Sequence, residues 1–186
     1  MSLLVLGDSA GAGVGAEYQE QALLGRLIKG LQRFSLRWEL WAKTGHSTLD
    51  TIDEIRRRPP NEFDVVVVSL GVNDLTTLTP LFIWLQGQRT LIRILQSRQR
   101  TRLIILSGLP PIHAFPLLPE PLRFCLGIRA RLFTWALGVL VQGEEGVRMV
   151  KLDQNFTVDM MSADGFHPGP PIYAIWSQSV IKEIRM

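Results

Sequence analysis

The chain has 186 residues, of which 46% are hydrophobic, so it is long enough for one well-packed core and does not require a second. We therefore expect a single domain over residues 1–186. The 20 basic residues exceed the 17 acidic ones by only three and are scattered, which predicts a solvated basic face and argues against nucleic-acid binding. The single cysteine, Cys125, excludes an internal disulfide and a zinc cluster, and we interpret it as a small buried apolar group.

The chain shows neither a secretory signal nor an uninterrupted membrane-spanning segment. Met1 leads directly into an apolar stretch typical of a strand, without the basic region and cleavage site of a signal peptide. The longest uncharged stretches, residues 103–119 and 165–181, contain several prolines and glycines, which a bilayer-spanning helix seldom carries. We expect a soluble, cytoplasmic protein without an integral membrane segment, and the pattern does not indicate its oligomeric state.

Strand-like and helix-like segments alternate along the chain. Short apolar runs typical of strands buried on both faces occur at residues 3–6, 36–41, 65–70, 103–106 and 147–152. Helical apolar spacing occupies residues 17–34, 48–57, 80–99, 121–142 and a final segment after Pro168. This alternation predicts an open α/β fold, a layered sandwich around a five-stranded parallel sheet.

Polar residues and glycines follow three of the predicted strands, at residues 7–9, 44–47 and 71–74. In open α/β sheets the carboxyl ends of the strands form the edge at which ligands bind. The fourth strand leads instead into a proline-rich apolar loop, residues 109–119. We therefore expect a site at this edge, with the loop as one wall of a pocket for apolar substrate groups.

Ser9, Asp164 and His167 together have the residue types of a nucleophilic triad. A serine hydroxyl needs a histidine to take its proton, and usually a carboxylate to hold that histidine in the right tautomer. The three-residue spacing of Asp164 and His167 puts both on one side of a helical turn or compact loop. Structural alternatives are that Ser9 caps a helix, and that a histidine before a proline only supports the fold.

Acyl transfer also needs hydrogen-bond donors for the oxyanion, each worth about 3 kcal/mol of barrier when correctly aimed. The candidates at the strand ends are the backbone N–H groups of Ser9 and Gly45 and the side-chain amide of Asn73. Alternatively, Gly45 relieves a turn with positive φ, and Asn73 or Asp74 caps the next helix.

These residues resemble the SGNH hydrolases, also called GDSL-type esterases and lipases. The resemblance covers nearly the whole chain and follows the family's order: Gly7-Asp8-Ser9, then Gly45, then Gly71-Val72-Asn73-Asp74, then Asp164-Gly165-Phe166-His167. It implies a flavodoxin-like three-layer α/β/α sandwich, with Ser9 as nucleophile, His167 as base and Asp164 as its partner. It also implies an oxyanion hole from Ser9, Gly45 and Asn73, and hydrolysis of a small-molecule ester or thioester through an acyl-enzyme, without a metal or other cofactor.

Ala10 departs from this pattern, since the family often has leucine after the serine; we expect it to affect the pocket or the packing of the helix and not the chemistry. Asp8 and Asp74 belong to the motifs, but we expect them to cap helices and form hydrogen bonds at the strand ends.

Four other interpretations compete with a serine esterase of this kind. Residues 7–11 match the G-x-S-x-G elbow of α/β-hydrolases, but only one strand precedes them. Residues 11–16 contain a variant dinucleotide fingerprint with Glu39 as candidate ribose ligand, which would make a non-catalytic nucleotide-binding module. A metal-dependent phosphoesterase could use Asp8, Asn73, Asp74, Asp164 and His167, although two-metal sites usually have more histidines than this chain offers. A binding module that keeps the fold without the activity is the fourth, and the retention of all four motifs argues against it.

The substrate is less well indicated. Apolar residues that could line an acyl or alcohol site are Trp84, Leu109, Ile112, Phe115, Leu117 and Leu118. At helical or loop spacing such residues are more often part of the core, and we favour that interpretation. No lid is evident, so we expect short to medium acyl groups.

Overall fold

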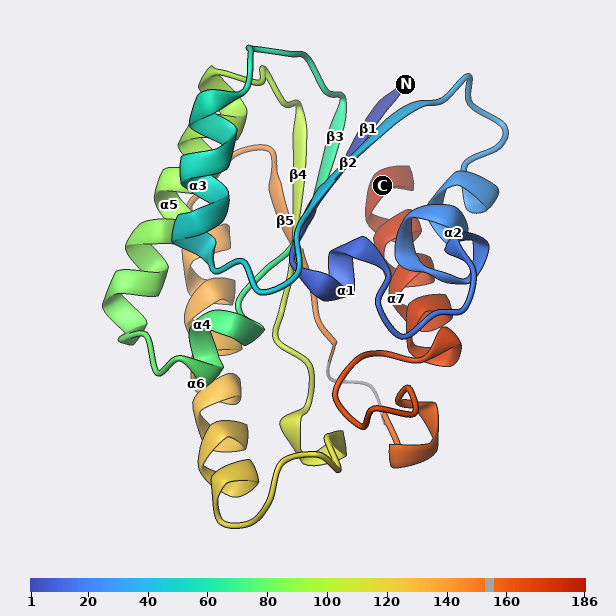
Figure 1. Ribbon diagram of the computed structural model, residues 1–186. Helices are drawn as coiled ribbons and strands as arrows, with labels where there is room; N and C mark the ends of the chain where they lie inside the picture. The colour runs from blue at the N-terminus through green and yellow to red at the C-terminus, as the bar shows by residue number, and fades with distance from the viewer. Residues whose placement is uncertain (153–155) are drawn as a thin grey trace.

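A five-stranded parallel sheet forms the centre of the molecule (Figure 1). The computed structural model describes residues 1–152 and 156–186. The strands lie in the order β2-β1-β3-β4-β5, and their bounds are Ser2–Gly7 for β1, Arg37–Ala42 for β2, Val65–Ser69 for β3, Leu103–Ser107 for β4 and Val147–Val150 for β5. The predicted fold class is confirmed.

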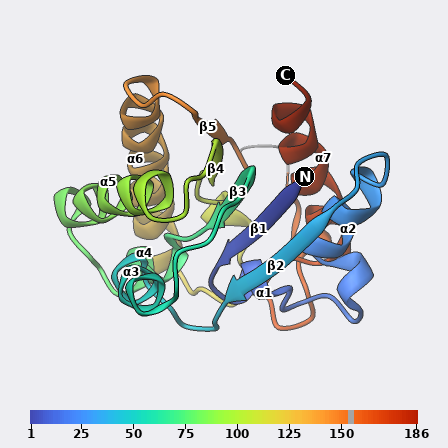
Figure 2. The same cartoon turned by 90° about the horizontal axis from the view of Figure 1, so that it is seen from above.

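Helices cover both faces of the sheet (Figures 1 and 2). One face carries α2 (Leu23–Gly30) and α7 (Pro170–Arg185), and the other carries α3 (Thr48–Arg57), α5 (Leu81–Ser97) and α6 (Leu122–Gln142). Successive strand side chains point to opposite faces, so Leu4 and Leu6 join the core under α5 and α6 while Leu3 and Val5 join the core under α2 and α7.

One predicted strand differs in its environment from what its sequence indicates. Residues 36–41 have the composition of a strand buried on both faces, but β2 is an edge strand. Arg37 and Trp38 are exposed there, and only Trp41 is buried. An apolar run shows that a segment is compatible with the sheet, but strand order decides whether a neighbour covers it.

The predicted helix over residues 17–34 is also wrong in part. A 3₁₀ turn, η1 (Gln19–Gln21), precedes α2, and Ala22 between them is extended. Two short helices that the periodicity does not predict are α1 (Ser9–Ala12) and α4 (Val72–Thr76), each too short to display a helical period. One residue separates α1 from the end of β1 and two residues separate α4 from the end of β3, so both helices lie at the carboxyl edge of the sheet. Two further 3₁₀ turns are η2 (Ile112–Ala114), in the apolar loop, and η3 (Val158–Met160).

Helix α6 is apolar on both its inner and its outer side. Its inner residues Leu126, Phe133 and Leu137 are buried in the core, whereas Cys125 is exposed, so the prediction of a buried cysteine is wrong. Within the described residues, α6 is the one helix long and apolar enough to cross a membrane, with a mean hydropathy of 1.6 over 18 residues. Length and composition are weak evidence for a membrane span, because core helices have the same properties.

Candidate active site

Ser9 stands at the first position of α1, immediately after the carboxyl end of β1. The residue that caps this helix is Asp8, whose carboxylate accepts a hydrogen bond of 3.0 Å from the Ala10 N–H. The interpretation of Ser9 as a helix cap is therefore wrong, and the predicted capping role of Asp8 is confirmed. Ser9 is only 8% exposed, yet its hydroxyl is available for another partner.

That partner is His167, although 158 positions separate the two residues. The Ser9 Oγ lies 3.0 Å from His167 Nε2, and His167 Nδ1 lies 2.5 Å from Asp164 Oδ2. A histidine with a hydroxyl on one ring nitrogen and a carboxylate on the other has the geometry of a general base whose tautomer is fixed. The structure thus brings the three predicted triad residues into one chain of contacts.

The loop that carries Asp164 and His167 is tightly hydrogen-bonded. Asp164 Oδ1 accepts hydrogen bonds from the backbone N–H groups of Phe166 and His167, both at 2.9 Å, and from the Ser162 hydroxyl at 2.6 Å. Burial by itself would raise the pKa of Asp164, but these hydrogen bonds and the His167 ring outweigh it and hold the pKa well below its usual range. Asp164 therefore stays ionised and can orient His167 throughout the neutral range.

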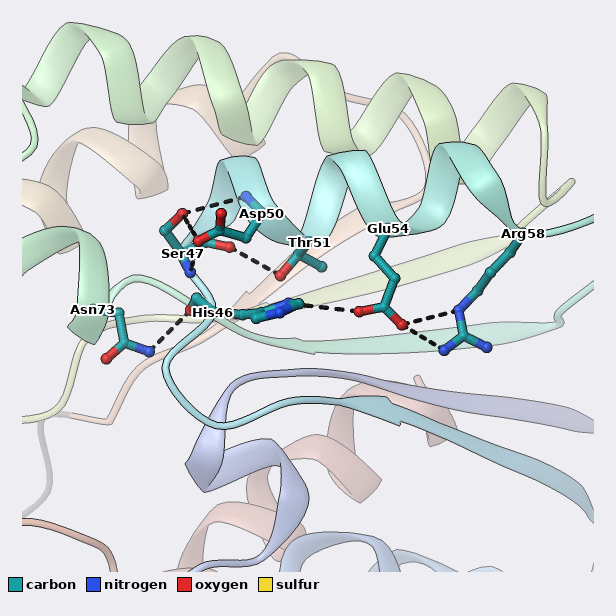
Figure 3. A network of polar contacts seen from close by, with 7 residues as sticks. All are labelled: His46, Ser47, Asp50, Thr51, Glu54, Arg58 and Asn73. Carbon is teal, nitrogen blue, oxygen red and sulfur yellow. Dashed lines mark hydrogen bonds and ion pairs between the residues drawn. The ribbon is translucent and has the colours of Figure 1, made fainter.

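Asn73 and the loop that carries Gly45 are joined at the same edge of the sheet (Figure 3). The Asn73 side-chain amide donates a hydrogen bond of 2.9 Å to the backbone carbonyl of His46, the residue after Gly45. An amide NH₂ has two donor hydrogens, so one remains for a ligand. Gly45 has a φ of +83°, as the turn interpretation predicts, and open space lies where a side chain would project.

The rest of this loop is anchored to α3 (Figure 3). Ser47 and Asp50 form a reciprocal capping box at the start of the helix. The His46 ring lies 3.6 Å from the Glu54 carboxylate, which also accepts hydrogen bonds from Arg58. This network holds the Gly45 turn in place before any substrate arrives.

Asp74 performs a structural task at the same edge. Its buried carboxylate accepts hydrogen bonds from both the backbone N–H and the hydroxyl of Thr48, the first residue of α3, and Gln88 donates to the same hydroxyl. Burial raises the pKa of Asp74 even though these hydrogen bonds oppose the shift. The predicted hydrogen-bonding role is confirmed, but the predicted capping role is wrong: α4 begins after Gly71 without a side-chain cap, and Ser47 caps α3, whose first N–H group donates to Asp74.

A small cavity lies beside the Ser9 hydroxyl. Its volume is about 50 Å³, a few times the roughly 10–15 Å³ that one water requires. Ser9, Asn73 and His167 line it on one side, and apolar residues from several elements complete it: Leu70, Leu109, Phe115, Leu152, Phe156, Phe166, Ile172 and Trp176. Gly45 is not part of this lining. The site thus combines a nucleophile, a base and an amide donor with a mostly apolar wall.

Comparisons with known proteins decide the family. The model of the GDSL-like Lipase/Acylhydrolase family matches residues 5–175. The chain belongs to this family. The match confirms the predicted family.

Individual relatives of this GDSL-like chain are distant in sequence. It is 24% identical to the GDSL-like esterase Rv1075c of Mycobacterium tuberculosis (strain ATCC 25618 / H37Rv), over 98% of this chain but only 61% of that protein. Solved structures with the same fold include the psychrotrophic esterase EstA from Pseudoalteromonas sp., with a TM-score of 0.73 at 16% identity, covering 99% of this chain and 96% of that one. A lipolytic protein of the G-D-S-L family from Veillonella parvula has a TM-score of 0.79 at 13% identity, with 98% and 97% covered.

The apolar residues singled out in the sequence of this GDSL-like chain have different environments. Leu109, Phe115, Trp84 and Ile112 are all buried in the core, and Leu109 and Phe115 also line the cavity. Leu117 is exposed, and Leu118 is partly buried against the core. The core interpretation therefore holds for some of the set only, because the loop over residues 109–119 contributes to both the core and the cavity.

Two residues on α7, Tyr173 and Trp176, support the site and were not predicted from the sequence. The Tyr173 hydroxyl lies 2.6 Å from the Val14 carbonyl and 3.1 Å from the Ala10 carbonyl, so it fastens the glycine-rich loop after Ser9. Burial raises the pKa of Tyr173 above its usual range, which keeps this hydroxyl a donor. Trp176 donates to the Ser107 hydroxyl at 3.0 Å and lines the cavity. The sequence does show a tyrosine and a tryptophan one helical turn apart in the last helix. Because the O–H of a buried tyrosine and the N–H of a buried tryptophan usually find a hydrogen-bond partner, this pair could have indicated polar contacts there.

The alternative sites look different in three dimensions. Glu39, the candidate ribose ligand, accepts hydrogen bonds from Trp41 and Asn61 on the β2 edge. Among residues 1–152 and 156–186, no three His, Cys, Asp or Glu side chains are grouped as metal ligands would be. Asp8 and Asp74 instead point to backbone N–H groups.

Proposed function

We propose that this chain is a serine hydrolase that cleaves carboxylic esters of short acyl groups through a covalent acyl-enzyme. The observation that carries the proposal is the continuous contact from Ser9 Oγ through the His167 ring to the Asp164 carboxylate, at the mouth of an apolar cavity. A serine placed only for structure would not need a histidine whose second ring nitrogen is held by a carboxylate.

In the first half of the reaction, Ser9 Oγ forms a bond to the ester carbonyl carbon while its proton passes to His167 Nε2. The carbonyl π electrons move to oxygen and give a tetrahedral oxyanion. When this intermediate collapses, the bond to the alcohol oxygen breaks and His167 returns its proton to that oxygen. The alcohol leaves, and the acyl group remains on Ser9.

In the second half, His167 takes a proton from water, and the oxygen of that water attacks the acyl carbon. Collapse of the second intermediate breaks the bond to Ser9 Oγ, which recovers its proton from His167, and the acid is released. Asp164 holds the ring in the tautomer that both halves require and stabilises the imidazolium that forms in each.

The oxyanion is assigned to three donors: the backbone N–H groups of Ser9 and Gly45 and the free hydrogen of the Asn73 amide. The hydrogen bond from Asn73 to the His46 carbonyl supports this assignment, because it holds the side chain and the Gly45 turn together. Donors fixed in advance need no reorganisation when charge develops, which is where their catalytic effect arises.

The size of the cavity supports a preference for short acyl groups. A volume of about 50 Å³ accepts an acyl group of a few carbon atoms and excludes a long chain unless the apolar walls move. We therefore expect p-nitrophenyl acetate and butyrate to be cleaved with higher kcat/KM than p-nitrophenyl decanoate.

The decisive test compares Ser9→Ala, His167→Ala and the double variant on p-nitrophenyl acetate, with Ser97→Ala as matched control. Ser97 is an exposed serine on α5. We expect each single variant to lose about 10⁴-fold or more in kcat, the double variant to lose little beyond that, and the control to retain activity, because triad residues act as a unit. EDTA should leave the wild-type rate unchanged, whereas a metal-dependent phosphoesterase would lose its activity.

Covalent labelling gives an independent readout. The EstA structure is inhibited by monoethylphosphonate, and a fluorophosphonate probe should likewise attach to this chain at Ser9, as identified by mass spectrometry of the peptide. Labelling of another serine, or near-normal turnover by Ser9→Ala, would refute Ser9 as nucleophile.

A further inference from the structure

The outer side of α6 carries a continuous apolar stripe, which we call the α6 face. It consists of five large apolar residues that are about half exposed or more: Phe124 (62%), Ile128 (51%), Leu132 (46%), Trp135 (66%) and Val139 (52%). Their spacing of three or four positions puts them on one side of the helix. At 1.5 Å per residue, the stripe is about 22 Å long.

Packing within the described chain does not account for this face. The residues that α6 contributes to the core, among them Leu126, Phe133 and Leu137, lie on the opposite side of the helix. A surface helix normally places polar residues toward solvent, and a large exposed apolar patch marks a site of interaction with a partner or a membrane.

The charged residues within α6 itself are all basic, and the flanking acids are Glu120 before the helix and Glu144 and Glu145 after it. Arg123, Arg129 and Arg131 lie on α6, and no aspartate or glutamate occurs between Leu122 and Gln142. The nearest acid before the helix, Glu120, is already paired with Arg123 at 2.9 Å. Arg129 donates to the Thr79 carbonyl and stacks on the core residue Phe133, so Arg131 is the arginine that borders the face without either engagement. An apolar helix face with basic residues at its rim is typical of helices that lie in the surface of anionic membranes.

A groove runs along one flank of the face and has a volume of about 660 Å³. Trp135 and Val139 from the face line it, and its charged lining consists of Arg131, Lys151 and the ion pair of Arg123 with Glu120. It borders the catalytic cavity, with which it shares Leu109, Pro110 and Leu152. The basic groups are thus placed where a lipid headgroup would meet the rim of the face.

A second copy of the chain fits this surface less well. Arg131 lies near the midpoint of α6, so two α6 helices packed along the stripe would bring Arg131 of one copy level with Arg131 of the other. Like charges brought together at an interface are unfavourable. A surface of anionic lipid has the complementary charge and accepts the whole length of the stripe.

We propose that the α6 face is a docking surface for an anionic lipid bilayer, on which α6 lies parallel to the membrane plane without crossing it. The apolar side chains enter the boundary between headgroups and acyl chains, and Arg131 and Lys151 contact lipid phosphates. This interaction is independent of ester hydrolysis.

The test is sedimentation of the protein with vesicles of phosphatidylcholine alone or with 30% phosphatidylglycerol. We expect binding to the anionic vesicles to be at least about tenfold stronger, and to weaken in 0.5 M NaCl because salt screens the arginines. Trp135→Ser and Arg131→Glu should each reduce it by about tenfold. The matched control is Trp38→Ser, which removes a tryptophan of similar exposure on β2, at the opposite edge of the sheet, and should bind as the wild type does.

Circular dichroism melting curves establish that the variants are folded, and light scattering gives the oligomeric state. Absence of binding to anionic vesicles by the folded wild type would overturn the proposal, as would equal losses for Trp135→Ser and Trp38→Ser. A dimer that Trp135→Ser dissociates would assign the face to a second copy instead.

Discussion

Asp8 offers a sharp test of the electrostatics around the nucleophile. Its carboxyl is 3% exposed, lines the catalytic cavity and accepts a hydrogen bond from the Ala10 N–H. Burial raises the pKa of Asp8 from its ordinary value of 3.8 to about 6, although hydrogen bonds from Ala10, Gly11 and Ser69 act in the opposite direction. The perturbation is Asp8→Asn, which keeps the shape and the acceptor oxygen but cannot ionise.

The sign of the effect follows from proton binding. Between pH 3.8 and about 6 the folded protein holds the Asp8 proton while the unfolded chain has released it, so the free energy of unfolding falls as the pH rises through this window. At 1.36 kcal/mol per pKa unit, the change amounts to about 3 kcal/mol. The stabilisation that the neutral Asp8 carboxyl gives, relative to the ionised one, is fully present below pH 3.8 and lost above about pH 6. Asp8→Asn does not ionise and so lacks this pH dependence. Its free energy of unfolding should therefore rise by about 3 kcal/mol relative to that of the wild type between pH 4 and pH 7.

Urea denaturation of both proteins at several pH values from 4 to 7.5 measures this difference. The other ionisable groups are common to the two proteins, so their contributions cancel in the comparison. A difference that stays constant across the window to within about 0.5 kcal/mol would refute the reasoning, because Asp8 would then ionise with an ordinary pKa. A difference that changes in the opposite direction would mean that the hydrogen bonds outweigh burial.

Three further substitutions test individual contacts. Asn73→Ala should lower kcat about 10²–10³-fold with little change in KM, because its amide would bind charge formed only in the transition state; a change in KM alone would assign Asn73 to ground-state binding. It should also lower the melting temperature, since the hydrogen bond to His46 is lost. Tyr173→Phe should cost about 1–2 kcal/mol in urea denaturation and lower kcat, because the loop after the nucleophile loses its fastening; full stability would contradict this role. Asp74→Ala should cost about 2–4 kcal/mol, since two buried donors of Thr48 lose their acceptor, and Asp74→Asn should recover part of the loss.

Much of the fold could be predicted from periodicity. Residues 48–57 form a helix with the predicted bounds. The helix predicted over residues 80–99 begins one position later and ends two positions earlier, and the helix predicted over residues 121–142 begins one position later and ends where predicted. These segments are long enough to show the helical period of their apolar residues. The short helices α1 and α4 are not, and each depends on the residue before it, since the Asp8 side chain caps α1 and Gly71, with a φ of 126°, precedes α4.

The reacting residues of the candidate site could be predicted from the sequence, but the residues that hold them in place could not. Ser9, Asp164 and His167 are marked by short motifs with few alternative chemical uses. Tyr173 carries no such mark, because its role depends on two backbone carbonyls near the other end of the chain.

The sequence by itself determined the alternation of strands and helices, the residue types at each strand end and, through four ordered motifs, the family. Those properties are local, since each rests on side-chain spacing within a few residues. Only the tertiary structure decided that Asp8 and not Ser9 caps α1, that β2 is an edge strand, and that the outer side of α6 is exposed in the part of the chain that the structure describes. Each of these depends on which segment lies against which, and apolar spacing records that a side chain avoids water without recording what covers it.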